Sequence, residues 1–168
     1  MIAGPSEPAF AMHATTDLCD AHADLQVCEP IFGDFGGQLA FGGRAKTLKV
    51  FEDNQRVREL LETPGEGRVL VVDGGGSPRC ALVGGNLGVL AENNGWAGLL
   101  VYGYVRDTEE LAGCAVGIKA LGTFPRKSEK GLHTPHEDRV LDFANVRIGP
   151  DSWVYADIDG VVIADREL

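Results

Sequence analysis

Two long apolar segments, separated by a stretch that could form one helix, place the strongest constraint on the fold. RVLVVDGGG (Arg68 to Gly76) and GLLVYGYV (Gly98 to Val105) are almost continuously hydrophobic. Runs of this kind are typical of strands buried on both faces of a sheet. The intervening PRCALVGGNLGVLAENNG (Pro78 to Gly95) is interpreted as mostly helical. Strand, helix and strand in this order favour a parallel βαβ unit with a right-handed crossover.

Weaker patterns on both sides of this unit predict a mixed α/β protein. A short helix is expected over 15–23, with Thr16 or Asp17 as its N-cap, and another within 52–63, with Asp53 or Asn54 able to cap it. The glycine pairs in FGGQLAFGG (35–43) are expected to mark turns, and DTEELAGC to form one or two helical turns. Further β elements are expected at 45–51, 117–124, 140–148, 152–160 and 161–165, with turns at Gly149-Pro150 and Asp159-Gly160 and a polar loop over 126–139.

Length and composition indicate one domain with its own hydrophobic core. The chain has 168 residues, of which 44% are hydrophobic. Residues 1–14 are expected to form a flexible lead, with residues 1–11 either native or derived from a vector and Met12 an alternative start. Residues 15–168 are expected to form the single domain.

Charge and hydropathy make several classes of protein unfavourable. The net charge is −10 and Lys and Arg do not cluster, whereas proteins that bind nucleic acid directly normally show a basic face. No apolar run approaches the roughly 18 residues that a membrane helix needs. The N-terminus lacks a basic region followed by a long apolar one, so no secretory signal is expected. We therefore expect a cytoplasmic protein without membrane or direct nucleic-acid contacts.

Two motifs that could carry chemistry have a simpler structural interpretation. The turn Asp73-Gly74-Gly75-Gly76 follows a strand, but neither GxGxxG nor a P-loop is matched, so a tight turn is favoured over nucleotide binding. His133 and His136 could bind a metal only if both faced the same way. Pro135 between them argues against a helix, and a solvated loop is the favoured interpretation.

Two other motifs leave alternatives open. Gly84-Gly85-Asn86-Leu87 could begin a helix whose free N–H groups bind an anion, or its glycines could allow close packing against another backbone. Arg106-Asp107 follows an apolar strand, where Asp107 could cap a helix with Glu110 in the capping-box position. Alternatively, Arg106 could bind a carboxylate and Asp107 a hard divalent cation, because α/β sheets bind ligands at the carboxyl ends of their strands.

Many segments, in order, resemble the regulator of ribonuclease activity A (RraA) family, which includes the class II 4-hydroxy-4-methyl-2-oxoglutarate aldolases. The resemblance extends from about Thr16 to Ala164. It implies a swivelling β/β/α domain of the RraA-like, phosphohistidine-domain-like type, with mixed sheets and a parallel βαβ core. The matching segments are EPIFGDFGG, FGG, KVFEDN, GRVLVVDGGGSPRCALVGGNL, GWAGLLVYGYVRD, GIKALGTFPRKS and YADIDGVVIA.

The same resemblance implies roles for particular residues. The turn Gly84-Gly85-Asn86-Leu87 would bind the substrate carboxylate through backbone amides, and Arg106 would bind the 2-oxo acid. Asp107 would anchor a divalent cation, Mg²⁺ or Mn²⁺, and Glu110 would be the supporting acidic residue three places later. Arg106 and Asp107 would thus be the catalytic pair. Relatives often have an acidic residue at the second position of the turn, where this chain has Gly85.

Two functions follow from the resemblance. The first is a metal-dependent lyase that cleaves 4-hydroxy-4-methyl-2-oxoglutarate to pyruvate, decarboxylates oxaloacetate, or both, through the same pyruvate enolate. The second is a protein-binding regulator that inhibits an endonuclease of the RNase E type. The resemblance also implies a ring-shaped homotrimer, or a dimer of trimers, with sites between subunits.

Overall fold

The computed structural model describes residues 12–168, and most of the predicted lead, residues 1–11, lies outside the described residues. The helices are α1 (Thr15–Ala21), α2 (Gln55–Leu61), α3 (Gly85–Asn93) and α4 (Thr108–Ala112). The strands are β1 (Gln26–Val27), β2 (Gly33–Asp34), β3 (Phe41–Lys49), β4 (Val69–Asp73), β5 (Ala81–Val83), β6 (Gly98–Val105), β7 (Gly117–Thr123), β8 (His136–Glu137), β9 (Leu141–Phe143), β10 (Val146–Ile148), β11 (Trp153–Asp157) and β12 (Gly160–Ala164).

A parallel core of four strands forms the centre of the main sheet. β3 pairs with β4, β4 with β6 and β6 with β7, all in parallel. Strands β4 and β6 are the two apolar segments from which the βαβ unit was predicted, so that prediction is confirmed. The full strand order, β1-β12-β11-β3-β4-β6-β7-β2, adds antiparallel neighbours at both ends, and β5 and β8 pair with β6 and β3.

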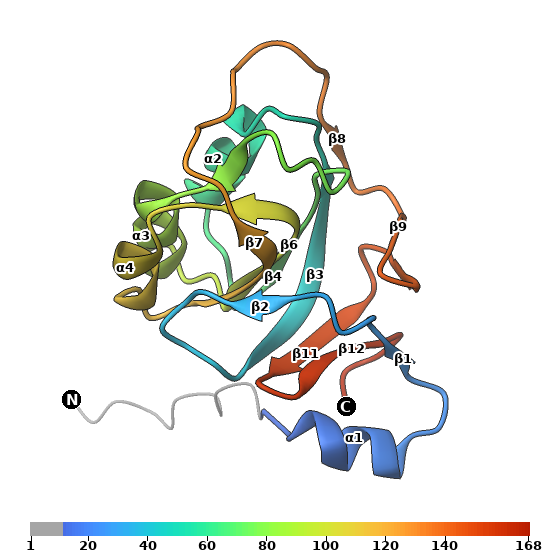
Figure 1. Ribbon diagram of the computed structural model, residues 1–168. Helices are drawn as coiled ribbons and strands as arrows, with labels where there is room; N and C mark the ends of the chain where they lie inside the picture. Colours follow the sequence, from blue (N-terminus) through green and yellow to red (C-terminus); the bar gives the residue numbers. More distant parts are fainter. Residues whose placement is uncertain (1–11) are drawn as a thin grey trace, which may run out of the picture.

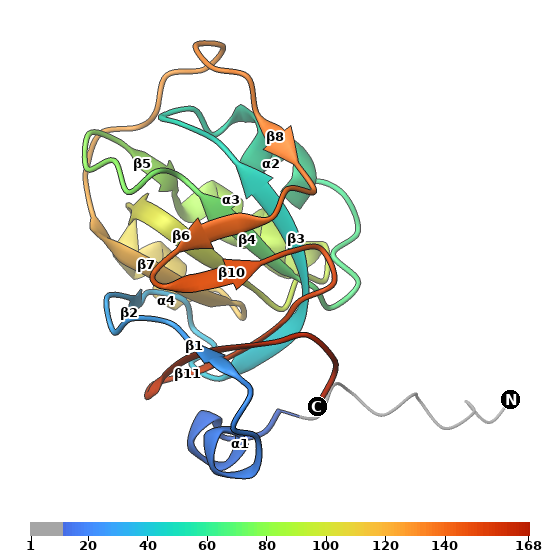
Figure 2. The same ribbon diagram turned by 90° about the vertical axis from the view of Figure 1, so that its right-hand side faces the viewer.

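The C-terminal segment is antiparallel, as the sequence predicts. β11 and β12 form a hairpin that pairs with β3 through β11, and a separate hairpin joins β9 to β10 (Figure 2). The mixed α/β class with a parallel βαβ core is therefore confirmed. No helix in the described residues is long and apolar enough to cross a membrane.

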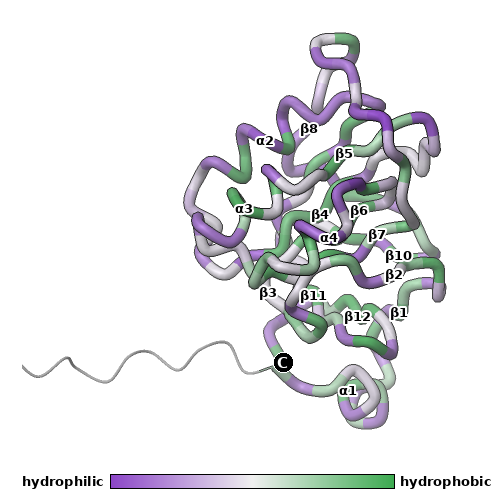
Figure 3. Tube along the Cα trace, turned by 60° about the vertical axis from the view of Figure 1, so that its left-hand side comes forward, coloured by the Kyte–Doolittle hydropathy of each residue, from purple (hydrophilic) through white to green (hydrophobic). Residues whose placement is uncertain are grey.

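Side chains of β4 point alternately into two hydrophobic cores, which explains why this segment is apolar throughout. Leu70 and Val72 pack with the helical layer of α2, α3 and α4, whereas Val69 and Val71 pack with β9, β10, β11 and β12. Figure 1 shows the three helices on one side of the sheet and β9 on the other. In Figure 3 the hydrophobic colour follows β4 through the interior of the molecule. All five β4 residues are buried.

The N-cap expected for the first helix is wrong by two or three residues. α1 begins at Thr15, and Ala14 occupies the N-cap position without a side-chain bond. The Thr15 N–H and hydroxyl both donate to the carboxylate of Asp157, at 2.8 and 2.7 Å. A long-range contact to the β11–β12 turn thus fixes the start of the helix, in place of a local cap by Thr16 or Asp17.

The segment 78–95 is only half helical, contrary to the prediction. Ala81–Val83 forms β5, which pairs in parallel with β6, and α3 begins only at Gly85. Pairing with the C-terminal end of β6 overrides the local helical pattern.

One predicted strand and one predicted turn also differ from the structure. The stretch 140–148 is a hairpin, in which Ala144 and Asn145 both have positive φ and form the turn between β9 and β10. The pair Gly42-Gly43 lies inside β3 and not in a turn. A Cβ at Gly43 would lie 2.2 Å from the carbonyl oxygen of Gly67, so close approach of another backbone requires glycine there.

Candidate active site

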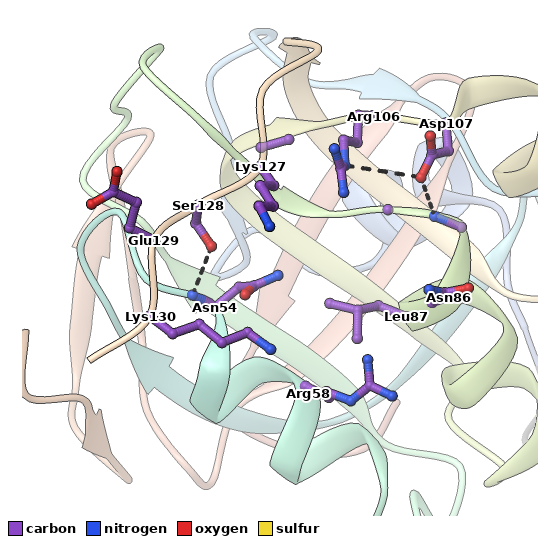
Figure 4. Close-up of a pocket in the computed structure, with 13 residues that line it drawn as sticks. Asn54, Arg58, Asn86, Leu87, Arg106, Asp107, Lys127, Ser128, Glu129 and Lys130 are labelled. Atoms are coloured by element: carbon purple, nitrogen blue, oxygen red, sulfur yellow. Dashed lines mark hydrogen bonds and ion pairs between the residues drawn. The ribbon is translucent and has the colours of Figure 1, made fainter. Parts of the chain in front are cut away.

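A cavity of about 490 Å³ lies at the carboxyl edge of the parallel sheet. Its walls come from the segments that follow β3, β6 and β7 and from the connection between β5 and α3. Open α/β sheets commonly bind ligands at this edge, because the ends of parallel strands bring their loops together. Figure 4 shows the side chains that surround the cavity.

The turn Gly84-Gly85-Asn86-Leu87 lines the cavity and begins α3. Gly84 is the N-cap, and its carbonyl accepts hydrogen bonds from Leu87 and Gly88, both at 3.1 Å. The Asn86 N–H donates to no protein atom within the described residues. The first turn of α3 therefore presents a free N–H group and the positive end of the helix dipole to the cavity. This confirms the prediction that a helix begins here.

Asp107 connects the end of β6 to this helix terminus. Its Oδ2 accepts the N–H of Gly85 at 2.9 Å, and its backbone is left-handed, with φ 59° and ψ 49°. Asp107 occupies the N-cap position of α4 but makes no side-chain cap hydrogen bond there. The predicted capping box with Glu110 is therefore wrong, because the carboxylate turns toward α3 instead.

The glycines of the turn allow α4 to pack closely against the start of α3. A Cβ at Gly84 would lie 2.7 Å from Oδ2 of Asp107, and a Cβ at Gly85 would lie 1.8 Å from Oε2 of Glu110. The turn is thus closely packed, but against acidic side chains and not against another backbone, as that alternative had it. The Glu110 carboxylate lies where a side chain at position 85 would have to be.

Arg106 places its guanidinium in the cavity, beside Asp107. Nε lies 4.0 Å from Oδ2 of Asp107, and Nη1 donates to the carbonyl of Pro125 at 3.5 Å. Both side chains are about 40% exposed, at 39% and 41%. The structure thus places the predicted pair in the same cavity as the predicted turn, residues 84–87.

Several residues of the cavity were not predicted from the sequence. Asn54 and Arg58 come from the start of α2, and residues 127–130 from the segment after β7. The edge rule for parallel sheets could have indicated both, since they follow the carboxyl ends of β3 and β7. The polar stretch 126–139 was predicted to be a loop, but His136 and Glu137 within it form β8. The unpredicted lining residues are Asn54, Arg58, Ala81, Lys127, Ser128, Glu129 and Lys130.

Buried hydrogen bonds hold residues 127–131 against the start of α2. The Asn54 N–H donates to Oγ of Ser128 at 3.1 Å, and the Gly131 N–H donates to Oδ2 of Asp53 at 2.7 Å. Oδ1 of Asp53 also accepts the Gln55 N–H at 3.0 Å, whereas Asn54, the other predicted cap, occupies the N-cap position of α2 without a side-chain cap hydrogen bond. Ser128 and Asp53 are 5% and 6% exposed. The segment is therefore fixed at two points on the cavity wall.

The carboxylates at this edge suit a hard divalent cation that keeps water in its shell. Asp107 uses Oδ2 for the Gly85 amide, which leaves Oδ1 available, and Glu110 lies beside the same glycine. Mg²⁺ is commonly bound by one or two carboxylates together with water and substrate. No group of three or more His, Cys, Asp or Glu arranged for a metal occurs in residues 12–168. The donor set fits a water-rich Mg²⁺ or Mn²⁺ site and not a closed structural one.

The two motifs given structural interpretations lie outside the cavity. Asp73 accepts the Gly75 N–H at 2.9 Å within a tight turn, and Gly75 and Gly76 have positive φ. The His133 ring packs edge-on against Phe51, with ring centroids 5.4 Å apart, while His136 lies in β8. The turn 73–76 thus lies at the carboxyl edge without lining the cavity.

Comparison with known proteins shows similarity over nearly the whole chain. The sequence profile of the RraA-like family, described as Aldolase/RraA, matches residues 15–163. A protein of Burkholderia mallei (strain SAVP1) named "Putative 4-hydroxy-4-methyl-2-oxoglutarate aldolase" is 58% identical over 163 residues, which cover 94% of this chain and 98% of the relative.

Two solved structures share the fold closely. A Geobacillus kaustophilus HTA426 protein, described as S-adenosylmethionine: 2-dimethylmenaquinone methyltransferase, is 48% identical with a TM-score of 0.89, covering 93% of this chain and 97% of that one. The RNA-processing inhibitor RraA from Thermus thermophilis is 45% identical with a TM-score of 0.88, covering 93% and 94%. The architecture and the family profile agree: this chain belongs to the RraA-like (Aldolase/RraA) family.

Proposed function

We propose that this protein is a divalent-metal-dependent lyase for 2-oxo acids. It would cleave 4-hydroxy-4-methyl-2-oxoglutarate to two molecules of pyruvate, decarboxylate oxaloacetate, or do both. The single observation that carries the proposal is one cavity containing Arg106, Asp107 and the start of α3. The name of the 58% identical relative supports the first of the two substrates.

Both reactions break the bond between C3 and C4 of a 2-oxo acid. In the retro-aldol reaction the C4 hydroxyl loses its proton, C4 becomes the carbonyl of one pyruvate, and the bonding electrons form the enolate of the other. In decarboxylation the C4 carboxylate leaves as CO₂ and the same enolate remains. Protonation at C3 completes each reaction. The site must therefore stabilise negative charge that develops on the 2-oxo oxygen.

The residues of the chain divide this work. The first turn of α3, with the Asn86 N–H and the positive helix end, would bind the C1 carboxylate. The Arg106 guanidinium would orient the 2-oxo acid and balance the charge of the enolate. Asp107, with Glu110 beside it, would hold Mg²⁺ or Mn²⁺, which when bound supplies Lewis-acid polarisation of the 2-oxo group.

The proposal is tested by following pyruvate release from each substrate with Mg²⁺, with Mn²⁺ and with excess EDTA. We expect turnover with either metal, loss of turnover with EDTA, and a large loss in Arg106→Gln. Turnover that resists EDTA, or turnover of neither substrate, would contradict a metal-dependent lyase.

A second candidate function is regulation of an RNA-degrading endonuclease of the RNase E type. It is favoured by the 45% identical Thermus structure, which is described as an RNA-processing inhibitor. The net charge of −10 would suit contact with basic RNA-binding regions of such a partner. The test is a pull-down with the purified endonuclease, and no complex at micromolar concentrations would count against regulation.

We also propose that the chain assembles as a homotrimer, or as a dimer of trimers, in the cytoplasm. This follows from the family to which it belongs. Light scattering of the purified protein tests it, and a monomer at micromolar concentration would contradict it.

A further inference from the structure

Two lysines of the segment after β7 face the cavity that Arg106 also lines. Lys127 and Lys130 both line it, and Figure 4 shows their side chains extending from the segment after β7 toward the space below Arg106. Glu129, between them in the chain, points its carboxylate away from that space. Neither lysine forms an ion pair or a hydrogen bond with another residue of the described chain.

The positive charge of this wall contrasts with the rest of the protein. The chain carries a net charge of −10, yet the charged side chains that line the cavity are four cations, Arg58, Arg106, Lys127 and Lys130, and two carboxylates, Asp107 and Glu129. Arg58 is paired, since its Nε donates to Oε1 of Glu62 at 3.0 Å. Two unpaired ammonium groups repel each other, and an anion bound between them would offset that repulsion. Such a wall also attracts anionic ligands from solution.

Buried contacts fix the backbone from which both lysines extend. Ser128 lies between them and accepts the Asn54 N–H at 3.1 Å, and Gly131 follows them and donates to Asp53 at 2.7 Å. A ligand that binds these lysines therefore has to order two side chains but not the segment itself. Such preorganisation lowers the entropic cost of binding.

We propose that Lys127 and Lys130 form a second anion subsite that binds the distal carboxylate of a two-carboxylate 2-oxo acid. This rests on the proposed function, in which Arg106 and the start of α3 bind the 2-oxo acid end. The two sets of groups line one cavity of about 490 Å³, which is large enough for a five-carbon dicarboxylate. The subsite makes the enzyme selective for dicarboxylic over monocarboxylic 2-oxo acids.

The subsite affects the two reactions differently. In retro-aldol cleavage the distal carboxylate stays a carboxylate, so the lysines bind substrate and transition state equally and their loss raises KM alone. In oxaloacetate decarboxylation that carboxylate becomes neutral CO₂. The lysines then stabilise the ground state more than the transition state, so their loss raises KM and also raises kcat.

The subsite is tested first by binding, without turnover. Isothermal calorimetry in Mg²⁺ compares 2-oxoglutarate, which has two carboxylates, with pyruvate, which has one. Loss of one charge-assisted contact should weaken 2-oxoglutarate binding by roughly tenfold in Lys127→Met or Lys130→Met, and pyruvate binding by less than about twofold. Lys130→Arg should restore most of the affinity. Lys49→Met, an exposed lysine at the end of β3 outside the cavity, is the matched control.

Kinetics provide the second test. With oxaloacetate, Lys130→Met should raise KM by roughly tenfold and also raise kcat. Equal losses for 2-oxoglutarate and pyruvate, or unchanged 2-oxoglutarate affinity in both lysine variants, would overturn the subsite. If the wild-type protein turns over no 2-oxo acid but binds 2-oxoglutarate through these lysines, the lyase proposal fails and the subsite stands. If the wild-type protein turns over a 2-oxo acid but the lysine variants bind 2-oxoglutarate as tightly as it does, the subsite fails and the lyase proposal stands.

Discussion

Asp107 combines a structural contact with a proposed chemical role, and two substitutions separate them. Its Oδ2 accepts the Gly85 N–H at 2.9 Å, and its backbone is left-handed with φ 59°. Asn keeps a side-chain oxygen and tolerates this backbone, but it has no charge. Ala has neither the side-chain oxygen nor the charge, and it tolerates the left-handed backbone conformation poorly. We therefore expect Asp107→Asn to fold normally without activity, and Asp107→Ala to lose both stability and activity.

The magnitude follows from the two structural terms. A hydrogen bond to a charged group contributes about 1.5–3 kcal/mol, and we take about 1 kcal/mol because the Asp107 side chain is 41% exposed. Forcing Ala into the left-handed region costs about 1 kcal/mol more. The free energy of unfolding should thus fall by about 2 kcal/mol in Asp107→Ala. For a chain of this size that lowers Tm by about 4–8 °C, against about 1 °C for Asp107→Asn.

Both effects are measured on the same preparations. Thermal unfolding by circular dichroism gives Tm, and metal-dependent pyruvate release from oxaloacetate gives activity. Asp107→Ala with the wild-type Tm would refute the structural reasoning. Asp107→Asn with near wild-type, EDTA-sensitive activity would refute the role of the carboxylate charge in holding the cation.

Three further perturbations test other contacts. Gly85→Ala places a Cβ 1.8 Å from Oε2 of Glu110, so it should lower the free energy of unfolding in urea by about 1 kcal/mol. The double variant Gly85→Ala/Glu110→Ala should recover part of this loss, and additive losses would contradict the contact. Asp53→Ala removes a buried acceptor of two backbone amides, so the free energy of unfolding should fall by about 2 kcal/mol. Amide hydrogen exchange at 127–131 should also accelerate, and unchanged exchange would contradict the role of Asp53 in anchoring this segment. The Arg56 hydrogen bond lowers the pKa of Glu137, so this carboxylate adds stability above its unfolded pKa of about 4.3, and that stability is lost as pH falls through the lower folded value. Urea unfolding should therefore show Glu137→Gln about 1 kcal/mol less stable than wild type at pH 7 and equal to it near pH 2, and a constant difference would exclude this explanation.

The architecture near the site was predictable where burial alone decides conformation. β4 and β6 are buried along most of their length, so their apolar sequences indicate strands whatever surrounds them. The position of Arg106-Asp107 at the end of β6 then follows from the sequence. The start of a helix at Gly84-Gly85 was one of two open interpretations, because glycine fits both a helix terminus and a close contact.

The errors occur where distant residues compete with local patterns. Capping of its own helix was one of two interpretations for the Asp107 carboxylate, but the Gly85 amide, 22 residues away in the sequence, takes that bond. Thr15 likewise bonds to Asp157, which is remote in sequence, and this sets the start of α1. A local sequence pattern predicts a helix cap correctly only when no acceptor or donor from another part of the fold lies within hydrogen-bonding distance.

The sequence by itself determined the parallel core, the pair at the end of β6 and the family. Only the tertiary structure decided which other groups meet that pair, because Lys127 and Lys130 lie in a polar stretch without any periodic pattern. The carboxyl edges of β6 and β7 bring that stretch beside Arg106, and buried contacts of Asp53 and Ser128 hold it there. Strand order, which arises from long-range pairing, thus determines the second wall of the site.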